Sequence, residues 1–471
     1  MVSDDLIYGF VAVASVGAGC IFRDVLRDCT SRRWLATILG LTLLWLICGY
    51  HMIHLLITVT GNCLLLRVIA PTQDERYLPG ASFIWNFGYL AVFRTVHWFG
   101  IPAPSPVTNA AQLFLALRMV GLAFEIQDSY LRKVASSDKD SLGSKDVDLK
   151  IKYCNINVNS LAVVHYAFCY IGLLTGPYYK YRTYEDWLKL SDKVNLNRLQ
   201  PLIKRGKELP FIAVSYLFFS YFFNIKDVET EEFLDRSFLY RLLYMVPMFI
   251  IFRTRLYMAW IMSECMCFTA GLGAYPDKSS PRCGEGPTDY KQLDIEERNN
   301  KTIDYNFETI HNIDIYGCEL APTTKQGLRS WNMTVQYWLA NYIHRRVPPS
   351  LKAYRVAITM TVSAFWHGIH PGYYLSFLTV PPILMAEEVM IKAFRDGASP
   401  HMQQLFDWGC WFFKMRGFDY MCMGFLLLKL GSTLRYWYSI YFAGHIVIVL
   451  FFILGKLVLV LRPRKHQKMK D

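Results

Sequence analysis

Long uncharged runs dominate the pattern of hydrophobic and polar positions along the chain. A bilayer core takes about 20 predominantly apolar residues per helix, and continuous runs of this kind do not fit the alternating strands of a membrane barrel. The pattern therefore predicts an all-α polytopic membrane protein with about eleven transmembrane helices, folded as a single membrane domain over residues 1–471. The clearest runs are 6–22, 34–66, 77–93, 153–179, 356–386 and 436–455.

Two of these runs are too long for one straight crossing. The run 34–66 has Gly49 near its middle, and the run 356–386 is interrupted by Pro371 and Gly372. Since glycine and proline both disfavour a continuous helix, we expect a break at each of these points.

Basic residues indicate which helix ends face the cytosol. Residues 23–33, which follow the first apolar run, hold four arginines, and the tail at 462–468 is also strongly basic. The positive-inside rule predicts that both segments are cytosolic and that the N-terminus is lumenal. Chain ends on opposite sides require an odd number of crossings, which favours eleven.

The composition narrows the class further. Hydrophobic residues make up 53% of the chain and charged residues only 19%, against about 25% charged in a typical soluble protein. Disordered chains lack this hydrophobicity. The net charge of +12 is spread between apolar runs, which indicates attraction to anionic membrane lipids and argues against a nucleic-acid partner.

Two polar segments stand out among those that interrupt the membrane pattern. Residues 180–208 combine many lysines and arginines with Trp187, which predicts basic interfacial helices on the cytosolic side. Residues 276–330 carry both signs of charge and predict a structured extramembrane loop.

The sequence predicts no metal site. Its twelve cysteines are scattered and form no CxxC pair, so we expect them to be small buried side chains. Two HxxH pairs occur, His51 with His54 and His367 with His370. A di-iron centre of the desaturase type would need further histidine clusters and acidic ligands.

Ionisable residues inside the apolar runs need an explanation, because each costs about 2.5–3.5 kcal/mol at the centre of a membrane. Arg118, His165, Arg241 and Glu264 are of this kind. A structural ion pair is the simplest role, and Arg241 and Glu264, expected on successive helices, would neutralise one another. Binding of a phosphate head group is the alternative role for Arg241.

His367 has an unusual setting. Ser363 precedes it by four residues, so the two share one face of a helix that should end ahead of Pro371. An uncharged imidazole among aromatic and small residues is suited to act as a general base. A hydrogen-bonded structural histidine is the alternative.

A polar pair also occurs upstream, on an aromatic segment. Asn332 and Gln336 are four residues apart, between Trp331 and Trp338, so both amides lie on one face of a helix. This arrangement predicts a lined cavity, and an amphipathic interfacial helix is the alternative.

The segments 331–339 and 363–377, with asparagine and histidine in this order, resemble the signature of the membrane-bound O-acyltransferase family. Two further blocks agree with that signature, 176–187 and 241–276. The sequence is most similar to the lysophospholipid acyltransferase branch, and within it to the lysophosphatidylinositol acyltransferases.

The resemblance implies a helix bundle around a buried reaction chamber. There acyl-CoA would give its acyl chain to the free hydroxyl of a lysophospholipid, with lysophosphatidylinositol and a polyunsaturated donor as the expected pair. His367 would be the general base, and Asn332 would orient the substrate or stabilise the developing oxyanion. Acyl-CoA would be a co-substrate, with no cofactor and no metal, and the protein would work in phospholipid remodelling in the endoplasmic reticulum membrane. The residues expected to line the substrate passage are Ser363, Gln336, Trp338, Trp366, Tyr373, Tyr374, Tyr178 and Arg241.

Two other functions stay open at this point. A different member of the same family could acylate another lysophospholipid, a sterol or a protein. A secondary transporter could instead use Arg118, Arg241, Glu264 and His165 as a polar pathway. Internal repeats would favour a transporter, and none is visible in the sequence.

Overall fold

The computed structural model describes residues 4–69, 75–137, 145–191, 194, 196–298 and 303–461. The basic tail at 462–468 lies outside these residues. Helices make up almost all of the regular structure described, so the predicted all-α class is confirmed.

The chain divides into two compact units that draw on alternating stretches of sequence. The first unit comprises 1–211, 257–313 and 332–346, and the second comprises 212–256, 314–331 and 347–471. Because the chain passes repeatedly from one unit to the other, neither unit is a separate segment, and the single membrane domain stays a prediction.

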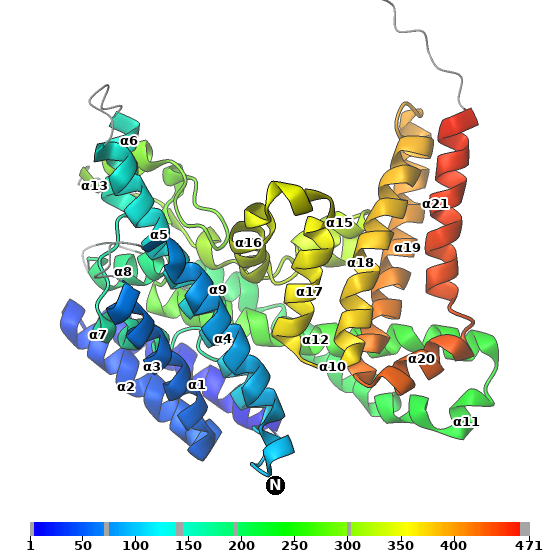
Figure 1. The fold of residues 1–471 in the computed structure, drawn as a ribbon, viewed down its shortest axis with the longest axis horizontal. Helices are drawn as coiled ribbons and strands as arrows, with labels where there is room; N and C mark the ends of the chain where they lie inside the picture. Colours follow the sequence, from blue (N-terminus) through cyan, green and yellow to red (C-terminus); the bar gives the residue numbers. More distant parts are fainter. Residues whose placement is uncertain are drawn as a thin grey trace, which may run out of the picture. The chain divides into compact units, whose positions relative to one another are not determined.

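Five long helices open the first unit. They are α1 (Asp4–Asp24), α2 (Cys29–Cys48), α3 (Met52–Ile69), α4 (Leu78–Thr95) and α5 (Pro106–Ser137). Helices α2, α3 and α4 lie side by side, and α5 packs on α3 and α4 (Figure 1). The Asp28 carboxylate caps α2 by accepting a hydrogen bond from Ser31 N at 2.8 Å. Gly49, with a left-handed φ of 53°, separates α2 from α3, which confirms the predicted break.

Shorter elements complete the first unit. Strands β1 (Tyr275–Pro276) and β2 (Tyr305–Asn306) pair antiparallel, so the predicted polar loop contains regular structure. The remaining helices are α6 (Lys145–Cys154), α7 (Ser160–Ala167), α8 (Tyr181–Lys189), α9 (Leu199–Gly206), α13 (Tyr290–Arg298) and α16 (Met333–Tyr342).

Helix α12 (Phe238–Ala270) is one continuous helix of 33 residues that contributes to both units, as does α10 (Leu209–Phe222). Because α12 carries both Arg241 and Glu264, the expectation that they lie on successive helices is wrong. Arg253 and Arg255 interrupt the apolar run but not the helix, since arginine is a good helix former.

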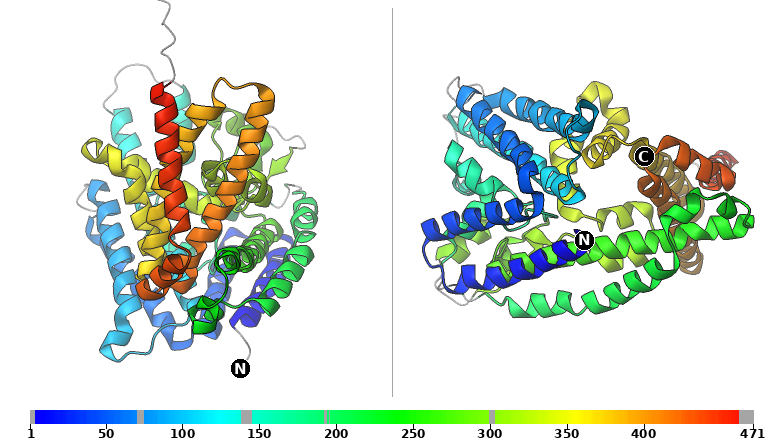
Figure 2. Two further views of the ribbon diagram at one scale, coloured as in Figure 1. Left: turned by 90° about the vertical axis from the view of Figure 1, so that its right-hand side faces the viewer. Right: turned by 90° about the horizontal axis from the view of Figure 1, so that it is seen from below.

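In the second unit, α18 (Pro371–Met390) packs against α17 (Arg355–His367), α19 (Pro400–Leu427) and α21 (Ala443–Leu461) (Figure 2). The proline at the start of α18 separates it from α17, so the second predicted break is confirmed. The other helices of this unit are α11 (Glu231–Leu234), α14 (Ile315–Leu320), α15 (Thr324–Arg329) and α20 (Leu430–Ser439).

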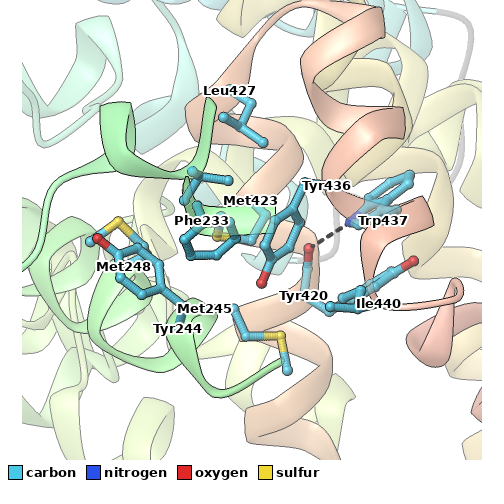
Figure 3. Close-up of a cluster of buried hydrophobic side chains, with 11 residues drawn as sticks. Phe233, Tyr244, Met245, Met248, Tyr420, Met423, Leu427, Tyr436, Trp437 and Ile440 are labelled. Atoms are coloured by element: carbon cyan, nitrogen blue, oxygen red, sulfur yellow. Dashed lines mark hydrogen bonds between the residues drawn. The ribbon is translucent and has the colours of Figure 1, made fainter. Parts of the chain in front are cut away.

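Large aromatic side chains fill the core of the second unit (Figure 3). The ring of Tyr420 on α19 stacks on that of Trp437 on α20, with 4.9 Å between the ring centroids. The Trp437 indole N–H also donates to the Tyr420 carbonyl at 3.4 Å. Phe233 and Tyr244 pack into the same core, so this cluster joins α11 and the first part of α12 to α19 and α20.

Six helical stretches within the described residues are long and apolar enough to span a membrane. This confirms the multi-pass class, while the count of eleven crossings stays a prediction. The stretches are Cys29–Ile69, Pro106–Val134, Leu199–Glu229, Phe238–Ala270, Pro371–Arg395 and Ala443–Leu461.

Candidate active site

His367 is the last residue of α17, at the joint between two helices of the second unit. Gly368 leaves the helix with an extended backbone. Pro371 then begins α18 at a position where the missing backbone N–H costs nothing. Ser363 lies one turn before His367 on α17, as predicted, and is buried.

Aromatic rings surround the half-buried His367 side chain. Phe377 stacks on the imidazole, and Phe425 meets it edge-on, each with 5.1 Å between ring centroids. Trp366 and Tyr373 also contact it, at 4.7 and 6.0 Å. The structure thus brings Trp366 and Tyr373 to His367, while their contact with substrate stays a prediction, and it adds two residues that sequence reasoning missed. Phe377 follows Tyr373 by one helical turn, a spacing that could have revealed it, but no local signal points to Phe425 on α19.

The rings continue from His367 through the second unit. Phe425 lies 5.1 Å from Phe252, and Phe252 stacks on Trp331 at 6.3 Å. Trp331 begins the first predicted motif and His367 belongs to the second. Parts of the two motifs therefore share one aromatic array within this unit.

Tyr374 and Arg241 have other surroundings in the second unit. Tyr374 lines an apolar groove of about 620 Å³ together with Pro371 and Leu378. Arg241 Nη1 donates to the carbonyl of Leu234 at 2.9 Å, which caps the last residue of α11. A phosphate contact for Arg241 stays a prediction.

Asn332 precedes the first residue of α16, in the first unit. Its backbone is left-handed, with φ 46° and ψ 53°, a conformation that asparagine tolerates better than most residues. The side chain makes no capping hydrogen bond. Its Oδ1 is buried and has no hydrogen-bond partner within the described part of the chain. A strained backbone and an uncommitted buried amide are typical of functional positions.

The other residues predicted around Asn332 are packed into the first unit. The backbone N–H of Gln336 donates to the Asn332 carbonyl at 3.0 Å, so the two are one turn apart, as predicted. Trp338 is fully buried, and its indole N–H donates to a backbone carbonyl of α5 at 3.0 Å. Tyr178 is also fully buried, and its backbone N–H donates to Thr334 Oγ1 at 3.0 Å. These contacts hold α16 in place, and contact of these residues with substrate stays a prediction.

The ionisable residues in the helices of the first unit form hydrogen bonds or ion pairs with other residues of the protein. Arg118 donates to four backbone carbonyls in and after α7. His165 Nδ1 shares a hydrogen bond with a threonine hydroxyl of α2 at 2.8 Å. Arg205, rather than Arg241, is the partner of Glu264, so the expected pairing of Arg241 with Glu264 is wrong. These contacts favour structural roles over a transport pathway.

The first unit also contains a polar cavity of about 450 Å³ beside the start of α8. The Glu125 carboxylate in its wall accepts hydrogen bonds from the backbone N–H groups of Tyr181 and Arg182. The Lys180 ammonium lies 5.3 Å from the ring centroid of Tyr337. Burial alone would lower the pKa of Lys180, but Tyr337 and Glu125 together raise it above its usual value, so the ammonium is charged. Other lining residues include the basic Arg132, Arg182, Arg345 and Arg346 and the acidic Asp128, Asp186 and Glu285.

The other end of α8 meets the basic segment that the sequence predicts to be cytosolic. Arg32 Nη1 donates to the Leu190 carbonyl and Arg23 Nη2 to the Ser191 carbonyl, both at 2.9 Å. Because α8 has only nine residues, one short helix connects the polar cavity to this basic segment.

Within the described residues, no group of three or more histidine, cysteine or acidic side chains is arranged to hold a metal ion. The twelve cysteines are free thiols, of which six are buried and Cys20 is exposed, so the expectation that all are buried is wrong for part of them. In the first HxxH pair, His54 Nδ1 shares a hydrogen bond with the Tyr89 hydroxyl at 2.9 Å, which gives that histidine a structural partner.

Comparison with known proteins gives a family match and several similar relatives. The sequence model of the membrane-bound O-acyltransferase family matches residues 143–427, which include Asn332 and His367. The chain is 41% identical to a membrane-bound acylglycerophosphatidylinositol O-acyltransferase of Xenopus laevis, over 100% of the chain and 97% of that relative. It is 41% identical to the Homo sapiens protein of the same description (94% and 92% covered). Identity to the Drosophila melanogaster protein is 34% (94% and 90% covered).

Proposed function

The chain belongs to the membrane-bound O-acyltransferase family, and on that premise we propose that it transfers a fatty acyl chain from acyl-CoA to the free hydroxyl of lysophosphatidylinositol. The observation that carries this proposal is the 41% identity, over the whole chain, to a protein described as an acylglycerophosphatidylinositol O-acyltransferase. The reaction serves phospholipid remodelling in the endoplasmic reticulum membrane, with a polyunsaturated acyl donor.

His367 acts as the general base in this proposal. Its imidazole takes the proton of the lysolipid hydroxyl while that oxygen attacks the thioester carbon. The tetrahedral intermediate then collapses and the C–S bond breaks. The CoA thiolate takes the proton from the His367 imidazolium, which restores the base. The aromatic rings around the half-buried His367 support this role because they limit the access of water, which would hydrolyse the thioester. General-base catalysis of this kind contributes about 10²–10⁴-fold in rate.

Asn332 supplies the carboxamide that helps to place the thioester and to stabilise the developing oxyanion. A single donor of this type contributes about 10²–10³-fold in known oxyanion holes. The uncommitted, buried side chain of Asn332 on a left-handed backbone supports the assignment.

The polar cavity beside α8 receives the phosphate-bearing part of acyl-CoA. Acyl-CoA is water-soluble and anionic, so it arrives from the cytosol. Helix α8 connects the cavity to the residues that contact Arg23 and Arg32, and the cavity wall contains five cations, Lys180 and Arg345 among them, against four carboxylates. These cations, together with the basic segment 180–208, supply the charge complement that CoA phosphates require.

An acceptor panel tests the proposed reaction. The purified protein, with one polyunsaturated acyl-CoA, is offered lysolipids bearing inositol, choline, ethanolamine or serine, along with a sterol and a peptide. We expect diacyl product mainly from lysophosphatidylinositol, measured by mass spectrometry. A different lysolipid, the sterol or the peptide as preferred acceptor would overturn the substrate assignment, and no acyl transfer to any acceptor would overturn the activity.

The base is tested separately, with folded His367→Ala protein. We expect turnover to fall by about 10²–10⁴-fold, whereas full turnover would remove His367 from the mechanism. Fluorescence microscopy of the tagged full-length protein, alongside an endoplasmic reticulum marker, checks the proposed location.

A further inference from the structure

Asn312 holds the two residues that follow Asn332. Its backbone carbonyl accepts a hydrogen bond from Met333 N at 2.7 Å. Its side-chain Oδ1 accepts hydrogen bonds from the Thr334 hydroxyl at 2.6 Å and from the Thr334 backbone N–H at 3.3 Å. Asn312 and Thr334 are both fully buried. Three hydrogen bonds thus join Asn312 to the start of a helix that lies 22 residues further along the chain.

These hydrogen bonds cap the N-terminus of α16. The first backbone N–H groups of any helix have no partner inside that helix, and an asparagine directly before the helix usually accepts from them with its side chain. Asn332 occupies that position in α16 but makes no such bond. Asn312 accepts from the first N–H groups instead, and the carboxamide of Asn332 is left uncommitted.

A buried charge holds Asn312 in turn. One oxygen of the Glu264 carboxylate accepts hydrogen bonds from the backbone N–H groups of Asn312 and Ile313, at 2.7 and 3.1 Å. The other oxygen pairs with Arg205 Nε at 2.8 Å. Glu264 is 0% exposed, so these contacts explain why a carboxylate is retained within a helix of largely apolar sequence. The chain of contacts runs from Arg205 through Glu264 and Asn312 to the residues beside Asn332.

We propose that Asn312 is a positioning residue for acyl transfer: it caps α16 in place of Asn332, and so frees the Asn332 carboxamide for the substrate. The inference rests on the proposed function of Asn332. Without the Asn312 side chain, the backbone N–H of Thr334 would lose its acceptor and would compete for the Asn332 side chain, which would then leave its reactive position.

The first test measures kcat and KM for Asn312→Ala, Thr334→Val and Thr334→Ser, each normalised to folded protein. We expect kcat to fall about 10- to 100-fold for the first two, since a displacement of about 1 Å near the reacting groups has an effect of this size. KM for both substrates should change less than about twofold, because substrate binding energy is not removed. Thr334→Ser keeps the hydroxyl and should retain kcat. Should Asn312→Ala fail to fold, the two Thr334 variants decide, and equal kcat for valine and serine would overturn the proposal. Because Thr334→Val also removes the acceptor of the Tyr178 N–H, its loss of kcat supports the proposal only if it adds nothing to the loss of an Asn332→Ala protein, and an added loss would overturn it.

A double-mutant cycle separates positioning from a general structural effect. Because Asn312 acts through Asn332, Asn312→Ala should add no further loss of kcat to an Asn332→Ala protein. Multiplied losses would overturn the proposal, as would unchanged kcat in Asn312→Ala when Asn332→Ala alone is impaired. If Asn332→Ala alone kept full turnover, the function proposed for Asn332 would fail, and the inference with it. Asn86→Ala is the matched control, since Asn86 is a fully buried asparagine of the same unit that bonds Asn62 and Ser82, and its kcat should equal that of the unmutated protein.

Discussion

The Arg205 guanidinium and the Glu264 carboxylate form an ion pair inside the first unit, with Nε 2.8 Å from Oε2. The Glu264 side chain is 0% exposed and that of Arg205 14%. Removing one partner of such a pair leaves an uncompensated buried charge. Arg205→Ala is therefore expected to lower the free energy of unfolding by about 3–5 kcal/mol, measured by thermal unfolding in detergent.

An exposed ion pair is the matched control for this prediction. Lys392 and Glu388 are one helical turn apart and 2.5 Å from each other, with side chains 55% and 66% exposed. Exposed pairs of this type contribute about 0.3–0.5 kcal/mol, so Lys392→Ala should change stability by no more than that. Equal losses in the free energy of unfolding for the two variants would show that burial of Glu264 does not determine the energy of its ion pair with Arg205.

Gly368 is required next to His367 because a larger residue has no room there. A Cβ at this position would overlap the ring of Tyr373, and that ring also contacts the His367 imidazole. Gly368→Ala should therefore displace Tyr373 and lower kcat about 10- to 100-fold, measured with lysophosphatidylinositol and acyl-CoA. Gly409→Ala, on α19 with open space around the position, should leave kcat unchanged. Unchanged turnover in Gly368→Ala would show that the contact between Tyr373 and His367 is not needed.

Much of the fold can be predicted from local sequence, and the errors of that prediction have a physical cause. Apolar runs longer than 30 residues predict a break, and Gly49 and Pro371 supply it where expected. Charged residues cause the opposite error, because they suggest a helix end where the helix continues. Arg253 and Arg255 look like the end of a span, yet arginine continues a helix well, so α12 runs through them.

The site is predicted from sequence only in part, because its chemistry is local and its surroundings are not. The His367 motif and the Asn332 motif are each visible in a short segment. Phe425 and Asn312, however, reach these residues from elements distant in the chain, and neither belongs to a local pattern.

Phe425 gives a test of the aromatic surroundings of His367. Its ring contacts His367 at 5.1 Å and Tyr373 at 4.6 Å between centroids. Aromatic pairs contribute about 0.5–1.5 kcal/mol each, so Phe425→Leu, which keeps most of the apolar volume, should lower kcat roughly 2- to 12-fold. Phe412→Leu changes a half-exposed phenylalanine of the same helix and should have no effect. The prediction fails if the two variants have the same kcat.

Arg345 tests whether the polar cavity takes the phosphates of acyl-CoA. Its side chain lies at the cavity wall, and removal of one exposed cation from a phosphate weakens binding by about 1 kcal/mol, or roughly fivefold. Arg345→Ala should therefore raise KM for acyl-CoA about fivefold while kcat is unchanged, and added salt should narrow the difference, because salt screens exposed charges. An acyl thioester of N-acetylcysteamine carries no phosphate, so its KM should be the same for both proteins.

Lys204→Ala is the control variant, because it removes an exposed cation of the basic segment 180–208 that does not line the cavity. If Lys204→Ala raised KM and Arg345→Ala did not, the surface of that segment, and not the cavity, would be the binding site for the CoA phosphates.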